Sequence, residues 1–300
     1  MYGGCRIYPN DNPWNTDISK APLDTDLNGK INMVPGTGMH PDWGTMTDNY
    51  GIPINSGPAG TPVPITWSTT YGPRESDKLP CPTGNNQFCY PIPLTAKIEG
   101  GTGAKSTADR HILFLDTNGA PDKCTLYELY NVQNPSGGGF RAASGAIFKL
   151  DSNALRTEGW TSADAAGLPI LPGLIRYEEI KAGIITHALR YTMETTRNAY
   201  IHPATHAAGD PGDSKPPMGM RIRLKASFND SSFSAASKVI VTAMKTYGLI
   251  LADNGSDWYF TGESNNAWDP EMDKLLQNFN QIKGSDFEIV KTGSITVQPD

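Results

Sequence analysis

The density of glycine and proline is the feature that most constrains what this chain can fold into. Glycine contributes 31 and proline 24 of its 300 residues. Glycine adopts backbone angles that other residues avoid, and proline interrupts helices and central strands. The richest part is residues 1–95, which contains the runs NDNPWN, PGTGMHPDWG and INSGPAGTPVPITW. We therefore expect this part to consist of turns and short extended pieces that wrap over a scaffold.

Short apolar runs between the turns predict β-strands. Runs of this length, rich in β-branched and aromatic residues, are typical of strands. The candidate strands cover residues 111–116, 124–132, 145–150, 174–180, 184–193 and 221–228. Joined by long connections, they predict an all-β dominated fold, namely an antiparallel β-sandwich of jelly-roll or lectin-like type.

Two segments near the C-terminus show the apolar period of helices instead. In SAASKVIVTAMKTYG, residues 234–248, the apolar side chains form one stripe and Gly248 ends the helix. In DPEMDKLLQNFNQIKG, residues 269–284, Asp269 caps the helix and Pro270 occupies its first turn. We expect both helices to lie at the periphery of the sheets.

The segment between these two helices predicts a β-hairpin. Its sequence, LILADNGSDWYF, places Asn254-Gly255 between two apolar runs, and Asn-Gly is a strong hairpin signal. No linker or internal repeat interrupts the chain, so we expect one domain over residues 1–300. Its parts would be the wrapping segment 1–95, a sheet core over 96–230 and a helix–hairpin–helix unit over 231–290.

The charge balance argues against several classes of partner. Apolar residues make up 38% and charged residues 19% of the chain, which supports a packed core. The formal net charge is −6, from 25 basic and 31 acidic residues, and no block of lysine and arginine occurs. A nucleic-acid partner is therefore not expected. No apolar run approaches the roughly 18 residues that a membrane helix needs, so we expect no membrane insertion.

The four cysteines predict two disulfide bonds. Cys5, Cys81, Cys89 and Cys124 contain no Cys-x-x-Cys pair, which makes a zinc site improbable. Four cysteines allow three pairings. The short loop CPTGNNQFC favours the pair Cys81–Cys89, which leaves Cys5 with Cys124. Disulfides persist in oxidising compartments, so a turn-rich chain of this kind is expected to be secreted or extracellular.

The segment THALRYTMETTRNAYIHPATH, residues 186–206, is the most suggestive cluster for catalysis. It holds three of the five histidines of the chain. On a strand, His187 and Tyr191 would share one face and Arg190 the other. If YIHPATH pairs back as the next strand, His202 comes close to His187 or Arg190. Arginine could then neutralise a uronate while histidine or tyrosine removes the C5 proton, as in a polysaccharide lyase. The alternative is a set of hydrogen-bonded residues on a sheet face.

Glycoside hydrolysis requires a pair of carboxyl groups instead. Glu128, in the middle of the strand-like run LYELY, is the best single candidate for one of them. Its possible partners, among which the sequence makes no choice, are Asp109, Asp116, Asp151, Asp164 and Glu178. The chain has no Gly-x-Ser-x-Gly, P-loop or Gly-x-Gly-x-x-Gly motif, so serine hydrolase and nucleotide-binding functions lose support.

The run GWTSADAAGLPILPGLIRYEEI, residues 159–180, reads mostly as a rigid corner. Ser162 can cap a single turn that Gly167 ends. Pro169 and Pro172 would then force an extended path into the next strand. If the catalytic site lies on the sheet that carries THALRYT, this corner would form its roof.

Three residues are candidates for contacts with a substrate: Trp160, Asp164 and His111. Exposed tryptophan rings can stack on the faces of sugars. Four tryptophans have loop-like surroundings, namely Trp14, Trp43, Trp67 and Trp160. The alternative is that these large side chains anchor loops to the core.

A calcium site is a weak possibility near the N-terminus, and no other metal or cofactor is expected. In LDTDLNGKI, Asp24, Asp26 and Asn28 occupy the first, third and fifth positions of a calcium loop. The twelfth position is Pro35, which cannot supply the bidentate carboxylate that such loops use. A solvated turn is therefore favoured.

The segment 159–180, together with SGAIFKLDSNALR, HALRYT and GSDWYFTG, resembles an uncharacterised family of secreted bacterial proteins, often found as domains of larger exported polypeptides. The resemblance covers roughly residues 5–290. It implies an exported location and a single domain, and it assigns no catalytic residue.

Together these observations predict a secreted carbohydrate-active protein. The expected partner is a polysaccharide or another glycan, on which the chain acts as a hydrolase or a lyase. One alternative is a non-catalytic glycan-binding or adhesive module, which would need only exposed tryptophans. Another is a structural extracellular protein that self-assembles through a large apolar surface.

Overall fold

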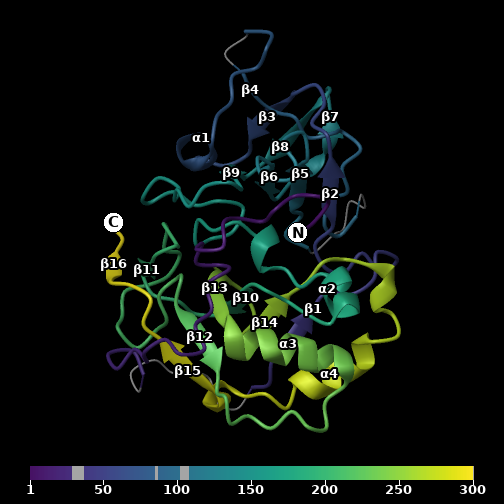
Figure 1. Ribbon diagram of the computed structural model, residues 1–300. Coiled ribbons are helices and arrows are strands. Elements are labelled where there is room, and N and C mark those ends of the chain that lie inside the picture. The colour runs from purple at the N-terminus through teal and green to yellow at the C-terminus, as the bar shows by residue number, and fades with distance from the viewer. Residues whose placement is uncertain (29–36, 85–86, 102–107, 300) are drawn as a thin grey trace.

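The computed structural model describes residues 1–28, 37–84, 87–101 and 108–299 (Figure 1). Strands dominate this part of the chain, with sixteen strands against four α-helices. The expectation of a mostly β fold is confirmed. The sheets are mixed, however, because β1/β14, β2/β5, β3/β8 and β10/β13 pair in parallel. The other strand pairs are antiparallel, so the sheets combine both directions and do not form the antiparallel sandwich of jelly-roll or lectin-like type that the sequence predicted.

A six-stranded sheet forms the lower half of the molecule in Figure 1. Its order is β1 (His40–Asp42), β14 (Tyr259–Thr261), β10 (Leu189–Met193), β13 (Leu249–Asn254), β12 (Arg221–Leu224) and β15 (Phe287–Val290). The helices α3 (Ala235–Thr246) and α4 (Met272–Phe279) lie across this sheet and contact each other. All five residues of β10 are buried, so this strand lies at the centre of the core.

Two four-stranded sheets form the upper half. One has the order β2 (Ile54–Gly57), β5 (Ile112–Asp116), β6 (Thr125–Tyr130) and β9 (Ser144–Lys149). The other has the order β4 (Phe88–Tyr90), β3 (Val63–Trp67), β8 (Gly139–Ala142) and β7 (Gln133–Ser136). A separate apolar cluster, which includes Tyr90, Phe114 and Phe140, joins the two sheets. Apolar burial of this kind is the main force that holds such layers together.

Smaller elements connect these layers. They are a two-stranded sheet of β11 (Ala199–Ile201) and β16 (Ile295–Val297), the helices α1 (Gly72–Glu75) and α2 (Tyr177–Ala182), and the 3₁₀ turns η1 (Leu171–Gly173), η2 (Asn266–Trp268) and η3 (Gly284–Asp286). The segment 1–95 contributes β1 to the lower sheet and β2, β3 and β4 to the upper ones. It therefore adds strands to three sheets rather than only covering them.

Both predicted disulfide bonds are present. Cys81 is bonded to Cys89, and Cys5 is bonded to Cys124. The second bond ties the N-terminal segment to the residue that precedes β6. None of the four cysteines is free.

The strands predicted over 111–116, 124–132 and 145–150 correspond to β5, β6 and β9, and those predicted over 184–193 and 221–228 are shortened to β10 and β12. The strand predicted over 174–180 is wrong. This segment enters α2, which begins at Tyr177. Glu178 in the first turn and Lys181 in the last turn complement the helix dipole. Gly183 ends the helix with φ 75°, a left-handed conformation that suits glycine. These end signals outweigh the alternating apolar pattern.

The predicted hairpin around Asn254-Gly255 is also wrong. β13 and β14 do not pair with each other, because β10 lies between them. A strand that is buried along its whole length needs a partner on each edge, and β13 and β14 supply them. Because β13 and β14 already occupy both edges of β10, the segment YIHPATH cannot pair with β10. Its strand, β11, pairs with β16 instead.

The first predicted helix is confirmed, and the second is shorter than expected. Ser234 caps α3 by accepting a hydrogen bond from the amide of Ser237. α4 begins at Met272, so Asp269 and Pro270 precede it rather than capping it. The 3₁₀ turn η2, which buries Trp268, occupies the chain just before them. No helix in the described part of the chain is long and apolar enough to cross a membrane.

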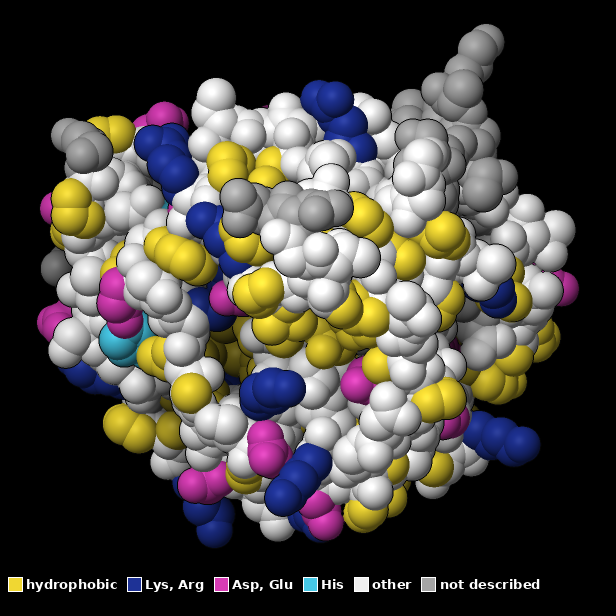
Figure 2. Space-filling view, turned by 90° about the horizontal axis from the view of Figure 1, so that it is seen from above, with side chains coloured by type: hydrophobic (Ala, Val, Ile, Leu, Met, Phe, Trp, Pro, Cys, Tyr) yellow, Lys and Arg dark blue, Asp and Glu magenta, His cyan; other side chains and the backbone are white. Residues whose placement is uncertain are grey.

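Lysine and arginine side chains are scattered over the face seen from above, with acidic side chains among them (Figure 2). This distribution fits the mixed charge pattern of the sequence.

Candidate active site

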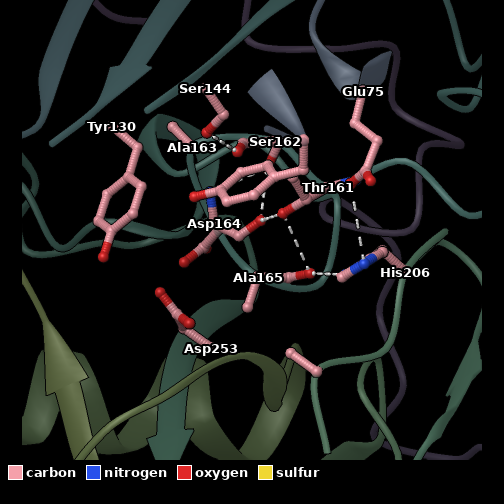
Figure 3. A pocket seen from close by; sticks show the side chains of 12 residues that line it. Glu75, Tyr130, Ser144, Thr161, Ser162, Ala163, Asp164, Ala165, His206 and Asp253 are labelled. Atoms are coloured by element: carbon pink, nitrogen blue, oxygen red, sulfur yellow. Dashed lines mark hydrogen bonds and ion pairs between the residues drawn. The ribbon is translucent and has the colours of Figure 1, made fainter. Parts of the chain in front are cut away.

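A cavity of about 370 Å³ lies between the upper sheets and the six-stranded sheet (Figure 3). Its lining comes from six parts of the chain: α1 and the residue before it, the end of β6, the start of β9, the segment 161–165, the residues 206 and 208, and β13. The lining residues are Tyr71, Glu75, Tyr130, Ser144, Thr161, Ser162, Ala163, Asp164, Ala165, His206, Ala208 and Asp253. The volume lies in the range of small-molecule sites.

The segment 161–165 is a rigid wall of this cavity. The hydroxyl of Ser162 accepts a hydrogen bond from the amide of Asp164 at 2.9 Å, as the sequence predicted for this turn. The hydroxyl of Ser144 donates to the carbonyl of Ser162 at 2.7 Å. Gly167 follows with φ 72°, which ends the turn. Side-chain hydrogen bonds to the backbone therefore fix where Asp164 lies.

Asp164 and Arg190 form a buried ion pair beneath this wall. The Nε and Nη2 atoms of Arg190 donate to the two carboxylate oxygens of Asp164. The remaining nitrogen, Nη1, donates to the hydroxyl of Thr261 at 2.9 Å. The side chain of Asp164 is fully buried, and that of Arg190 is 4% exposed. All three guanidinium nitrogens of Arg190 thus donate to side chains inside the protein.

Asp253, at the end of β13, is a second carboxyl group beside this pair. Its Oδ1 atom accepts from the amide of Asn254 at 2.8 Å, and its Oδ2 atom lies 3.8 Å from Nη2 of Arg190. Burial raises the pKa of Asp253 well above its ordinary value, and the charge of Asp164 raises it further. A side-chain hydrogen bond to Asp164 acts in the same direction. These effects favour the protonated acid.

Unlike Asp164, Asp253 remains accessible from the cavity, with 19% of its side chain exposed. Figure 3 shows the Asp164 and Asp253 carboxyl groups and the Tyr130 hydroxyl pointing toward the same part of the cavity. A buried acid that keeps its proton and still reaches a cavity is able to donate that proton to a bound molecule.

Glu75 and His206 form another wall. The Nδ1 atom of His206 faces the carbonyl of Ala165 at 2.7 Å, and Nε2 lies 4.0 Å from Oε2 of Glu75. Burial lowers the pKa of His206, which favours the neutral ring. The amide of Thr161 donates to the same carboxylate oxygen of Glu75 at 3.4 Å. With 22% of its side chain exposed, Glu75 is the second accessible carboxyl group of the cavity.

His111 is not part of the cavity lining, but its hydrogen bonds hold the segment 161–165 in place. Its Nδ1 lies 2.7 Å from Oε2 of Glu99, and its Nε2 lies 3.0 Å from the carbonyl of Ala163. Burial opposes a charge on this ring, but the carboxyl groups of Glu99, Asp109 and Asp164 together outweigh burial and raise the pKa of His111 to about 9. The protonated ring donates to both acceptors. The ring of Tyr130 lies 5.4 Å from that of His111. His111, predicted to contact substrate, therefore braces the wall instead.

The structure does not gather the predicted catalytic residues at one place. His187 contacts Glu179 at 3.0 Å and lines a different cavity. His202 is half exposed and contacts Glu158 at 2.7 Å on the surface. The fully buried ring of Tyr191 stacks on Trp258 with centroids 5.9 Å apart. Of the residues predicted to be catalytic in that cluster, Arg190 lies next to the cavity described above, while His206, at the end of the same segment, lines it.

Glu128 is fully buried and faces the backbone rather than this cavity. Its carboxylate accepts from the amides of Ile170 and Leu171 at 3.0 and 3.1 Å. Burial raises the pKa of Glu128 to about 7 against the opposing effect of these amides. Glu128 thus holds the start of η1 in place. The alternating pattern of the sequence correctly placed Glu128 on a strand. It could not show that the backbone of Ile170 and Leu171 lies against the Glu128 side chain.

The tryptophans serve mainly as anchors. Trp14, Trp43, Trp258 and Trp268 are almost completely buried. Trp160 is half-buried, and its carbonyl accepts a hydrogen bond from the hydroxyl of Thr205 at 3.2 Å. The residues that follow Trp160 form a wall of the cavity, and the ring itself is not part of the lining.

The residues of the predicted calcium loop are occupied by internal hydrogen bonds. The carboxylate of Asp24 accepts from the amides of Asp26 and Leu27, each at 3.0 Å. The side chain of Asn28 donates to and accepts from the backbone of Ile289. Pro35 lies outside the described residues. Among the residues that the structure describes, no group of three or more histidine, cysteine, aspartate or glutamate side chains is arranged to hold a metal ion.

Sequence reasoning missed Glu75, Asp253, Tyr130 and His206 as members of one site. Asp253 follows the apolar run LILA directly, and Tyr130 ends the strand β6. Polar residues at the ends of buried strands are a usable signal, because rigid strands position functional groups well. In comparisons with family models, curated proteins and solved structures, nothing matches this chain.

Proposed function

We propose that the chain is a glycoside hydrolase with Asp253 as its general acid. The observation that carries the proposal is the buried Asp253 carboxyl, which favours its protonated form and opens into a cavity with Glu75 on another wall. In glycoside hydrolysis, one carboxylic acid protonates the leaving oxygen, and a carboxylate on the opposite side of the sugar either attacks the sugar carbon, to be released later by water, or activates a water molecule that attacks it. Asp253 takes the first role and Glu75 the second.

Asp164 is a positioning residue in this mechanism. Both of its oxygens accept from Arg190, so it is not free to react with a substrate. Its contribution is to keep a proton on Asp253 through charge and hydrogen bonding. Raising the pKa of one carboxyl with a nearby one is a common way to obtain an acid near neutral pH.

The charges of the cavity favour a hydrolase over a lyase. A lyase that acts on uronates needs a basic side chain to bind the sugar carboxylate, but Arg190 is fully used by Asp164 and Thr261. The described lining contains Glu75, Asp164 and Asp253 and no lysine or arginine. Since Asp164 is paired with Arg190 and Asp253 favours its protonated form, Glu75 is the carboxyl group of the lining that opposes an anionic sugar. The substrate is therefore a glycan of neutral or amino sugars, with Tyr71 and Tyr130 as aromatic contacts.

The test is turnover of a polysaccharide panel, measured by the release of reducing ends. Replacing Asp253 with Asn or Glu75 with Gln is expected to lower turnover by about 10²–10⁴-fold, because each change removes a general acid or base. Thermal melting is expected to stay within a few degrees of the parent. Asp269→Asn, an exposed position outside the cavity, is the matched control and should keep full activity.

Full activity in both Asp253→Asn and Glu75→Gln would overturn the assignment. Binding of a glycan without any turnover by the parent protein would instead identify a binding module. Products that absorb at 235 nm would identify a lyase, since elimination leaves an unsaturated uronate.

We also propose that the protein works outside the cytoplasm. The two disulfide bonds support an oxidising compartment. Protein taken from its native host should have a mass four hydrogens below that of the reduced chain, and four free thiols would contradict this location.

A further inference from the structure

We propose that Glu75 and His206 together hold the water molecule that attacks the sugar, so that hydrolysis inverts the configuration of the anomeric carbon. This inference rests on the proposed function. It selects one of the two courses open to that reaction, because the carboxylate then activates water instead of attacking the sugar itself. The observation that carries it is the separation of 4.0 Å between Nε2 of His206 and Oε2 of Glu75.

This separation differs from the other histidine–glutamate contacts in the part of the chain that the structure describes. His111, His187 and His202 each contact a glutamate carboxylate directly, at 2.7, 3.0 and 2.7 Å. At 4.0 Å, the facing atoms of His206 and Glu75 are too far apart for a direct hydrogen bond. A water oxygen at about 2.8 Å from each atom can bridge them. Both side chains line the cavity and are 17% and 22% exposed, so a bound sugar can reach this water.

The contact at the other ring nitrogen makes Nε2 of His206 a hydrogen-bond acceptor. Nδ1 lies 2.7 Å from the carbonyl oxygen of Ala165, and a carbonyl oxygen only accepts, so Nδ1 carries the proton. Burial lowers the pKa of His206, which favours the neutral ring and leaves a lone pair on Nε2. Two acceptors, Nε2 and the Glu75 carboxylate, therefore face each other. A water molecule between them donates both of its hydrogens and keeps its own lone pairs for attack.

The segment 161–165 orients both acceptors of this water site. The amide of Thr161 donates to Oε2 of Glu75, the oxygen that faces His206, at 3.4 Å. The carbonyl of Ala165, four residues later, fixes the ring of His206. Because one rigid segment holds both side chains, the position of the water relative to the cavity wall is set before a sugar binds.

The acid and the water site occupy different parts of the cavity. Figure 3 shows Glu75 and His206 together, away from Asp253. In the proposed step the water oxygen forms a bond to the anomeric carbon, and one water proton passes to the Glu75 carboxylate. The bond from that carbon to the leaving oxygen breaks, and Asp253 gives its proton to this oxygen. The second water proton stays on the new hydroxyl, which donates to His206, and solvent then returns the proton of Glu75 to Asp253.

The configuration of the first product tests this step directly. The probe is a soluble hexamer prepared from the polysaccharide that the panel shows to be cleaved, and proton NMR follows the anomeric signals during the first minutes, before the product equilibrates. We expect the new reducing end to have the configuration opposite to that of the cleaved bond. A retained configuration would overturn the water site and leave Asp253 and Glu75 as acid and nucleophile. No turnover by the parent protein would overturn the proposed function and this inference with it.

Two variants of His206 separate the positioning of water from support of the wall. The amide of His206→Asn can still donate to the Ala165 carbonyl, but the side chain is too short to reach the place of Nε2. The longer His206→Gln side chain brings an acceptor to that place. We expect kcat to fall by about 10²-fold in His206→Asn with KM unchanged, and by less than about tenfold in His206→Gln. His202→Asn, which removes an exposed histidine from its contact with Glu158, is the matched control and should keep full turnover.

A purely structural role of His206 predicts the reverse order. Full kcat in His206→Asn together with a loss in His206→Gln would overturn the role of His206 at the water. Nitrogen-15 NMR of the ring gives a measurement that needs no substrate. At neutral pH we expect Nδ1 to show the shift of a protonated nitrogen and Nε2 that of an unprotonated one, and a ring protonated at both nitrogens would contradict the water site.

Discussion

Two buried clusters of carboxyl groups and arginine have opposite electrostatic balances. One consists of Asp164, Asp253 and Arg190 beside the candidate active site. The other consists of Glu179, Arg176 and His187, which line a cavity near the N-terminal segment. In the first cluster two carboxyl groups share one arginine. In the second, two basic side chains surround one carboxylate.

This difference in the number of basic partners determines whether each carboxyl group favours its protonated or its ionised form. Burial opposes ionisation in both clusters. His187 and Arg176 outweigh burial at Glu179 and lower its pKa to about 2, so this carboxylate is a fixed structural anion. At Asp253, burial and the charge of Asp164 outweigh Arg190 and raise the pKa. The ratio of basic to acidic groups, rather than burial alone, thus separates a proton donor from a structural ion pair.

Removing the arginine of the first cluster is expected to have the largest effect on stability. Arg190→Met leaves Asp164 buried without its partner and should lower the free energy of unfolding by about 3–5 kcal/mol. Arg6→Met removes an arginine from a pair whose two side chains are 51% and 63% exposed, and should cost no more than about 1 kcal/mol. Denaturant unfolding at neutral pH measures both. If Arg190→Met and Arg6→Met lowered the free energy of unfolding equally, Arg190 would not be compensating a buried charge.

Replacing the carboxylate of the second cluster should have a smaller, pH-dependent effect. Glu179→Gln is expected to cost about 3 kcal/mol at neutral pH, which corresponds to the lowering of the pKa from 4.5 to about 2. A lowered folded-state pKa gives stability that is present above the unfolded pKa and is lost as the pH falls. The difference between parent and variant should therefore shrink from about pH 4.5 down to about pH 2.

Unfolding curves measured across this range test the pH dependence, and the neighbouring exposed residue supplies the control. Glu178→Gln should change stability by less than about 0.5 kcal/mol at any pH. A cost of Glu179→Gln that does not vary with pH would mean that packing, and not charge, accounts for it.

The sequence predicted local features of the fold better than the pairing of strands. The helix α3, with its cap at Ser234 and its end at Gly248, is encoded by adjacent residues. The Cys81–Cys89 loop is similarly local. The insertion of β10 between β13 and β14 depends on burial of the whole strand, which no short run reveals. The sequence also contained the end signals of the helix α2, namely the glutamates of its first turn and Gly183 after its last residue. The alternating apolar pattern of the same segment predicted a strand instead.

The site was predicted only in part, for a related reason. Asp164 and Arg190 were both candidates, but their pairing removes Arg190 from contact with substrate. Asp253 and Glu75 come from elements that are distant in the sequence and meet only through the packing of sheets. The histidines of 186–206 are neighbours in sequence, yet the different partners of β10 and β11 place them in separate surroundings.

The protonation of Asp253 is the central claim, and a carboxyl NMR titration tests it directly. Protein labelled with ¹³C at the aspartate carboxyl would be followed from acid to alkaline pH, with the Asp253→Asn spectrum used to assign the resonance. We expect the Asp253 signal to keep the chemical shift of a protonated acid through the range where exposed aspartates ionise, near pH 4. If the Asp253 signal instead moves together with those of the exposed aspartates, Asp253 is not the general acid.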